Sequence, residues 1–300
     1  MAEPMFIGVD VGGSSCGNRT RGTRQIERFR MAARAGVFDF VEMHASAGGD
    51  LKPYFELVDR YALPVRVIDG TWGIGCDEAK AREMLDAGSR IGSKVLNLRL
   101  CGQRKEHGSL SDEQIVAFYL RLCEWGERVG CMPSLDACSM SSCDRARVAQ
   151  WGERIAQAGA PFRITLDLSE ASDPLNIDWI DRGWVYHVRT SGVLAPASNT
   201  RHEHADLTSA TAHTANAEPI QPTPLWAMNR AERWKRELRR LIHWQIHARR
   251  PRLRQITCAF ASQDAQGSVA ALDVLRENVA CARWLRDTWL CQMEKRYGAI

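Results

Sequence analysis

The chain has 300 residues, of which 45% are hydrophobic and 25% are charged, and this composition excludes low-complexity disorder and collagen-like repeats. The net charge of +4 at pH 7 is too small to predict a nucleic-acid partner by itself. Its apolar stretches are far shorter than the roughly 20 residues that cross a bilayer, and no signal peptide is expected, so we expect a cytoplasmic protein with no membrane partner.

The first half of the chain alternates short β-rich runs with amphipathic helical patterns. Strands are expected at 6–11, 38–45, 65–69 and 95–101, and helices at 23–35, 51–61, 77–92 and 111–130. The helix at 111–130 begins with a capping box, because Ser111 precedes Gln114 by three residues and each side chain can bond to the backbone of the other residue.

The second half continues the pattern and adds one long polar segment. Strands are expected at 132–137, 162–168, 184–189 and 253–260, helices at 143–158, 174–181, 229–247 and 268–297, and a loop at 190–224. Eight strand–helix units in a single domain, 1–300, predict an α/β protein with a closed (β/α)8 TIM barrel. A doubly wound open sheet is the main alternative, but residues 10–15 lack its G-x-G-x-x-G turn.

Charged side chains are expected where the barrel strands end, because functional residues of parallel barrels project from the carboxyl ends of the strands. A buried charge needs an opposite charge or a metal ion beside it. Asp136, Asp167 and His187, on successive strands, are therefore candidate ligands of a divalent metal. The alternative is a structural ion-pair network in which the same side chains pair with Arg99 or Arg189.

The order of these motifs along residues 5–297 resembles the xylose-isomerase-like barrel superfamily, which includes sugar-phosphate isomerases and epimerases, inosose dehydratases and relatives of endonuclease IV. The resemblance is carried by four short segments, at 36–42, 135–136, 166–170 and 186–188. It implies one divalent metal ion, Mn²⁺, Mg²⁺ or Zn²⁺, held by a Glu of strand five, an Asp of strand six, a His of strand seven and a Glu of strand eight.

The chain departs from this family pattern at three positions. Strand five offers Asp136 instead of Glu, Glu170 replaces the second histidine of strand six, and the strand at 253–260 contains no carboxylate. The metal site is therefore degenerate. Two alternatives stay open: a site with three protein ligands that keeps its metal, and a site that has lost it.

By resemblance, we expect a sugar or sugar-phosphate isomerase or epimerase, with a dehydratase or lyase as a variant, that acts by metal-assisted proton transfer on a small-molecule substrate. Asp136 and Glu170 are the candidate catalytic bases. The candidate substrate-binding residues are Glu42, His44, Arg99, Arg189 and, in the loop at 190–224, Arg201. The alternatives are a metal-free or non-catalytic barrel that binds a ligand or partner protein, and a nuclease-like phosphodiesterase.

Three further features concern partners. The ten cysteines include no Cys-x-x-Cys pair, which favours reduced thiols. The segment 230–254 carries ten basic residues, but Trp234, Leu238, Leu241 and Gln245 share one helical stripe, so we expect this helix to pack on the barrel with its arginines in water rather than to bind nucleic acid. The helix at 268–297 is longer than a barrel helix needs and is a candidate interface for a homo-oligomer.

Overall fold

A computed structural model of the chain describes residues 5–12, 21–44, 51–72, 78–100, 111–136, 142–167, 175–194, 229–247, 255–262 and 268–298. Within these ranges the side chains of some residues, Arg99 and Asp167 among them, are not described. No helix in the described part of the chain combines the length and the apolar character that a membrane span requires.

The described strands form a closed parallel barrel in which each strand pairs with the next along the sequence and β1 pairs with β8. This confirms the predicted (β/α)8 TIM barrel. The strands are β1 (Phe6–Asp10), β2 (Phe40–His44), β3 (Val65–Trp72), β4 (Val95–Leu100), β5 (Met132–Asp136), β6 (Ile164–Asp167), β7 (Val185–Leu194) and β8 (Gln255–Ser262).

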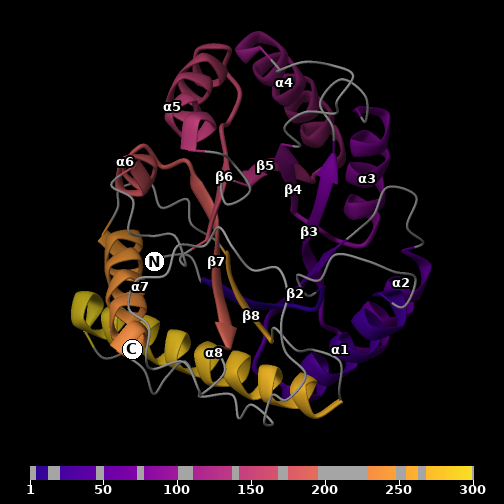
Figure 1. Cartoon of the computed structure of the whole chain (residues 1–300), viewed down its shortest axis with the longest axis vertical. Helices are drawn as coiled ribbons and strands as arrows, with labels where there is room; N and C mark the ends of the chain where they lie inside the picture. Colours follow the sequence, from indigo (N-terminus) through magenta and orange to yellow (C-terminus); the bar gives the residue numbers. More distant parts are fainter. Residues whose placement is uncertain are drawn as a thin grey trace, which may run out of the picture.

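The helices follow one another in chain order around the barrel and form a ring outside it (Figure 1). Apolar side chains from the outer faces of the strands and the inner faces of the helices form the main core. The helices are α1 (Arg21–Ala35), α2 (Lys52–Tyr61), α3 (Glu78–Arg90), α4 (Asp112–Val129), α5 (Ser142–Gln157), α6 (Leu175–Asp181), α7 (Asn229–His247) and α8 (Ser268–Tyr297).

Strand β2 shows how the sequence divides the wall of the barrel into two faces, because successive side chains of a strand point to opposite sides. Val41 and Met43 are buried in the main core that the helices cover. Phe40 belongs to a separate small cluster. Glu42 and His44 share the face of Phe40 and therefore point into the barrel.

An apolar layer fills the barrel interior near the beginnings of the strands. Phe40, Val67 and Val95 form this layer and are fully buried. Gly8 in β1 makes room for it, since a Cβ at this position would lie 2.4 Å from the ring of Phe40. The polar side chains of the interior therefore lie toward the carboxyl ends of the strands. We refer to the layer of Phe40, Val67 and Val95 below them as the apolar floor.

Two predicted helices have the ends and faces that their sequences indicate. Ser111 and Gln114 form the predicted capping box at the start of α4, and the helix ends at Gly130, whose φ of 77° favours glycine. In α7, the stripe residues Leu238 and Leu241 are buried, as predicted, and most described arginines on the opposite face are exposed.

Strand β7 is longer than predicted. It continues to Leu194 instead of ending at Arg189, because it pairs with β8 without interruption from His187 to Leu194. The polar and glycine-containing residues 190–194 read as a loop in the sequence, but this continuous backbone pairing incorporates them into the barrel. The remainder of the predicted loop, 195–224, lies outside the described residues.

Candidate functional site

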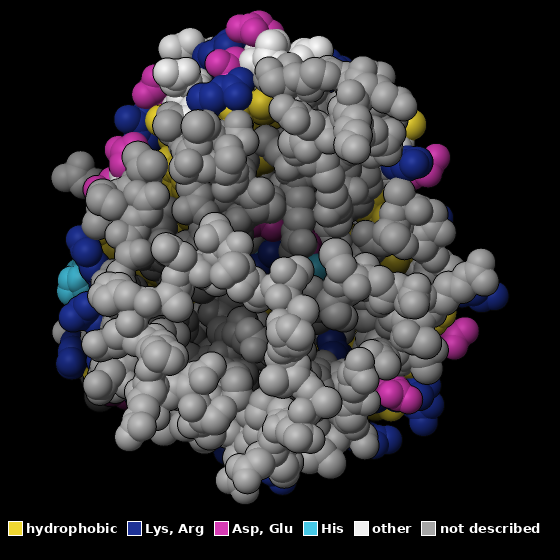
Figure 2. Space-filling model, viewed as in Figure 1, with side chains coloured by type: hydrophobic (Ala, Val, Ile, Leu, Met, Phe, Trp, Pro, Cys, Tyr) yellow, Lys and Arg dark blue, Asp and Glu magenta, His cyan; other side chains and the backbone are white. Residues whose placement is uncertain are grey.

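Polar and charged side chains from several strands meet inside the barrel, above the apolar floor. Acidic, basic and histidine side chains are visible deep at the centre of one face of the molecule (Figure 2). Charges at this depth are stable only when they are paired. The buried polar residues of this interior are Glu42, Asp69, Asn97, Ser134, Asp136, Thr165, His187, Arg189 and Thr257.

Arg189 is the central cation of this interior. Its guanidinium contacts carboxylates from three other strands: Glu42 of β2, Asp69 of β3 and Asp136 of β5. Nε lies 2.7 Å from Glu42 Oε1, and the two terminal nitrogens lie 3.0 Å from Asp69 Oδ1 and 3.2 Å from Asp136 Oδ2. We refer to these three carboxylates, Glu42, Asp69 and Asp136, as the carboxylate cluster.

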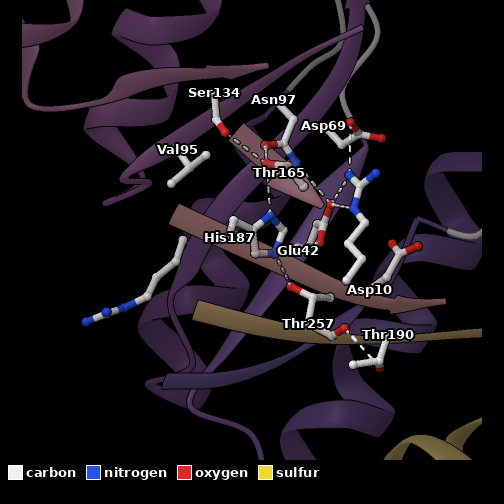
Figure 3. A network of polar contacts seen from close by, with 12 residues as sticks. Asp10, Glu42, Asp69, Val95, Asn97, Ser134, Thr165, His187, Thr190 and Thr257 are labelled. Atoms are coloured by element: carbon white, nitrogen blue, oxygen red, sulfur yellow. Dashed lines mark hydrogen bonds and ion pairs between the residues drawn. The ribbon is translucent and has the colours of Figure 1, made fainter. Parts of the chain in front are cut away.

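A chain of neutral hydrogen bonds lies beside the carboxylate cluster. Thr165 donates to Asn97 Oδ1 at 2.6 Å and lies 3.4 Å from Nδ1 of His187. On the other side of the imidazole, Nε2 of His187 lies 2.7 Å from the Thr257 hydroxyl. Figure 3 shows this chain between Val95 of the apolar floor and the carboxylate of Asp69. Each ring nitrogen of His187 therefore lies near a threonine hydroxyl inside the barrel, Nδ1 near Thr165 and Nε2 near Thr257.

His44, at the end of β2, lies between two carboxylates. Its Nδ1 is 3.1 Å from Asp69 Oδ2, and its Nε2 is 3.7 Å from Asp10 Oδ2. Gly12 lies against the ring, and a Cβ at this position would come within 1.8 Å of His44 Cδ2. The backbone N–H of Gly12 donates to Asp10 at 2.6 Å, which fixes the aspartate beside the imidazole. His44 and Asp10 are both partly exposed, unlike the carboxylate cluster.

The surroundings of His44 favour its charged form. Burial lowers the pKa of His44, but the charges of Asp10, Asp69 and Glu42 outweigh burial, so the pKa is raised above its ordinary value. The pKa of Asp10, beside His44, is shifted in the opposite direction. Burial raises the pKa of Asp10, but His44, Arg189 and the Gly12 N–H outweigh it and hold the pKa well below its ordinary value.

His187 and Arg189 are perturbed in opposite directions. Burial and the neighbouring Arg189 charge lower the pKa of His187 well below its ordinary value, so its imidazole is neutral. Burial lowers the pKa of Arg189, but Asp69, Glu42 and Asp136 outweigh this and raise it well above its ordinary value. Arg189 is therefore a permanent cation, whereas His187 is a neutral hydrogen-bonding group.

The structure brings five of the predicted site residues together: Glu42, His44, Asp136, His187 and Arg189. The predicted pairing of Asp136 with Arg189 is present. Four predicted residues are not tested. The side chains of Arg99 and Asp167, and the whole of Glu170 and Arg201, lie outside the described residues.

Two carboxylates of the site were not predicted from the sequence. Asp10 ends β1, and Asp69 lies within β3. Both stand near the ends of predicted strands, so the rule that polar residues gather at strand ends would have identified them. The threonines that contact His187 carried no comparable signal, because threonine is common on strands for reasons of packing alone.

The described residues of the predicted metal site do not fit a divalent metal ion. Asp136 is paired with the Arg189 guanidinium, and both ring nitrogens of His187 face threonine hydroxyls. Within the described ranges, no three His, Cys, Asp or Glu side chains are arranged to hold a metal ion. The proposed ligand set of Asp136, Asp167 and His187 therefore remains a prediction whose described members argue against it.

The interior offers groups suited to proton transfer. A partly exposed histidine beside carboxylates can exchange a proton with a bound molecule. The 3.7 Å separation of His44 Nε2 from Asp10 is longer than a hydrogen bond, which leaves Nε2 for a substrate atom. Among the described residues, no group donates a hydrogen bond to Oε2 of Glu42, although this oxygen is buried. It can accept a substrate hydroxyl.

Comparisons with known proteins establish the fold. No protein-family model matches the chain, and no curated protein sequence is similar to it. The chain is similar in structure to a xylose isomerase domain protein from Planctomyces limnophilus, with 15% identity, 97% of this chain and 98% of that chain covered, and a TM-score of 0.56.

Two further solved structures share the fold but are different kinds of enzyme, an epimerase and an endonuclease. One is a D-allulose 3-epimerase from Methylomonas sp., with 15% identity, coverage of 99% and 100%, and a TM-score of 0.53. The other is a family 2 AP endonuclease from Brucella melitensis, with 12% identity, coverage of 87% and 94%, and a TM-score of 0.53. The chain therefore shares the closed (β/α)8 barrel of these structures, and a barrel of this kind does not by itself define the chemistry.

Proposed function

We propose that the chain is an isomerase- or epimerase-like enzyme that moves a proton on a small polyhydroxy or carbonyl compound, a sugar or sugar phosphate being the expected example. The observation that carries the proposal is His44, which lies between Asp10 and Asp69 at the carboxyl end of the barrel. The fold supports it, because epimerases are among the structures to which the chain is similar.

In this mechanism, the unprotonated form of His44 takes the proton from the carbon beside a carbonyl group through Nε2, and the raised pKa of the ring makes it a stronger base. Asp69 Oδ2 lies 3.1 Å from Nδ1, and its charge favours the tautomer that carries the proton on Nδ1 and leaves Nε2 free. The imidazolium that forms is stabilised by Asp10 and Asp69. It returns the proton to the opposite face of the same carbon after the intermediate turns in the site, which completes epimerisation. Return to the neighbouring carbon, with the hydroxyl proton passing to the former carbonyl oxygen, completes isomerisation.

Other residues of the interior bind and orient the substrate. Glu42 Oε2 accepts a hydrogen bond from a substrate hydroxyl, and Arg189 holds Glu42 in place through two of its nitrogens. Asp136 is paired with Arg189 and fully buried, so it suits a supporting role better than that of a base. Arg99, Glu170 and Arg201 remain candidate substrate contacts or bases from the sequence.

A non-catalytic barrel that binds a small ligand is the second candidate. The ion pairs of Arg189 with the carboxylate cluster favour it, because they also satisfy the interior charges without any reaction. A nuclease-like phosphodiesterase receives less support, because the described interior residues are not arranged to hold the metal cluster that such an enzyme would require.

Exchange of substrate hydrogen with solvent distinguishes these functions. The protein is incubated in D₂O with a panel of ketoses, aldoses and their phosphates, and deuterium incorporation beside the carbonyl is followed by NMR. We expect incorporation by the parent and a loss of about 100-fold or more in His44→Gln, the usual scale for removing a general base. His243→Gln, at an exposed position of α7, is the matched control and retains the parent rate. Equal incorporation by His44→Gln would contradict the role of His44.

A further inference from the structure

Arg189 occupies the position in the carboxylate cluster where a cation is required. Glu42, Asp69 and Asp136 come from three different strands and approach the same guanidinium. Each of the three carboxylates has at most 1% of its surface exposed. Carboxylates buried this deeply can remain ionised only beside a positive charge.

A divalent metal ion and this guanidinium compete for the same oxygens. Glu42 Oε1 accepts from Nε and from a terminal nitrogen of Arg189, and Asp69 Oδ1 lies 3.0 Å from that same nitrogen. A hard cation would need these oxygens as its ligands. It would also stand within a few ångströms of a permanent positive charge, where repulsion in a buried site is strong.

We propose that the Arg189 guanidinium is the resident cation of the carboxylate cluster and excludes divalent metal ions from it. The site then works with a cation supplied by the chain, which needs no loading and cannot be removed by a chelator. A second consequence follows from the same geometry. Removal of the guanidinium leaves space among three carboxylates, and we expect them to close around one Mn²⁺ or Mg²⁺ ion.

Metal binding tests this inference separately from catalysis. The parent, Arg189→Met and Arg189→Lys are each dialysed against a chelator and then titrated with Mn²⁺, and bound metal is counted by electron paramagnetic resonance. Methionine removes the charge and keeps most of the side-chain length, whereas lysine keeps the charge. We expect no saturable binding at this site in the parent or in Arg189→Lys, and one equivalent in Arg189→Met, at least tenfold tighter than any binding by the parent.

The stability of the variant provides the second measurement. Without metal, Arg189→Met keeps three buried carboxylates that have lost their shared guanidinium, and it should melt at a lower temperature than the parent. Mn²⁺ should raise its melting temperature and leave that of the parent unchanged. If Arg189→Met stays unfolded with Mn²⁺ present, the proposal is contradicted, because a divalent ion should then replace the lost charge.

One result with the parent alone would also overturn the proposal, namely one bound equivalent of Mn²⁺ that Asp69→Asn abolishes. The inference rests on the proposed function in one measurement only, that of activity. Hydrogen exchange catalysed by the parent should continue after all divalent metal has been removed with a chelator. If no substrate exchanges hydrogen, the proposed function fails, while the metal-binding measurements still decide the role of Arg189.

Discussion

Two histidines inside the same barrel have pKa values that their surroundings shift in opposite directions. His44 faces Asp10 and Asp69, which raise its pKa, whereas His187 is fully buried between Thr165 and Thr257 and beside Arg189, which lowers its pKa. Residue type alone does not separate these roles. The separation comes from complete burial and the Arg189 charge at His187, against the carboxylates of Asp10 and Asp69 at the partly exposed His44.

Replacing Asp10 tests the origin of the raised pKa of His44. Asp10→Asn removes one negative charge beside the ring, so we expect the pKa of His44 to fall toward its ordinary value. An NMR titration of the histidine ring protons measures this fall without a substrate. Asp59→Asn, at an exposed position of α2, is the control and should leave the titration of His44 unchanged. A His44 pKa that is equal in parent and Asp10→Asn would contradict the electrostatic explanation.

The same pKa shift affects stability, with a definite sign. Because folding raises the pKa of His44 above its ordinary value of 6.5, the pairing stabilises the fold fully at pH values below 6.5. This contribution is lost as the pH rises through the folded pKa. Asp10→Asn should therefore be more destabilising at pH 5.5 than at pH 9, as measured by urea denaturation at the two pH values.

Among the elements, helix α4 shows how a glycine sets the distance between a helix and the wall. Gly126 faces β5, and a Cβ there would lie 2.6 Å from the backbone oxygen of Cys131. Gly88 of α3 is also packed closely, but its nearest neighbour is the flexible end of the Ile68 side chain, at 2.9 Å. The backbone oxygen of Cys131 cannot move away from an added Cβ, whereas the end of the Ile68 side chain can rotate away.

The two glycines therefore make a matched pair of variants. Alanine favours a helix by about 1 kcal/mol over glycine, but overpacking against a rigid neighbour costs about 1–3 kcal/mol. We expect Gly126→Ala to lower the free energy of unfolding by about 1 kcal/mol or more and Gly88→Ala to lower it less. Urea denaturation measures both. A larger loss in Gly88→Ala would show that the Cys131 contact does not limit the packing of α4.

Helices and strands were predictable from the sequence where neighbouring residues determine their ends. The capping box of Ser111 and Gln114 depends on a three-residue spacing, and the structure has it. The extension of β7 to Leu194 depends on pairing with β8, about seventy residues away, so no local pattern indicated it. The partners of Arg189 were partly predictable. Asp136 was expected, but Glu42 lies 147 positions away and meets Arg189 only through the closure of the barrel.

At the scale of the whole molecule, helix α8 exposes large apolar side chains, with the exposed Arg276, Arg283 and Arg286 between Leu272 and Leu290 on the same side. Leu272, Leu290 and Tyr297 are the large hydrophobic side chains that are exposed in the described part of the chain. Their spacings of 18 and 7 residues place them on one side of the helix, since an α-helix has 3.6 residues per turn. That the final helix forms a subunit interface stays a prediction from the sequence, and these side chains are where it can be tested.

We therefore expect the parent to be a homo-oligomer that Leu290→Lys weakens, because a charge would be buried in the interface. Light scattering after gel filtration should give a multiple of 33.7 kDa for the parent and a lower mass for the variant. Gln150→Lys, at an exposed position of α5 across the ring of helices, adds the same charge and should keep the parent mass (Figure 1). A monomeric parent would contradict the prediction.

The pairing of β1 with β8 has a consequence for biosynthesis. Strand β8 supplies the partner for the free edges of both β1 and β7. On the ribosome, these two edges stay unpaired until residues 255–262 have emerged, when most of the chain has already been translated. Unpaired strand edges are where nascent chains associate wrongly. The first strand to be synthesised must therefore wait for the last, and the yield of native protein depends on how well the cell protects that open edge during translation.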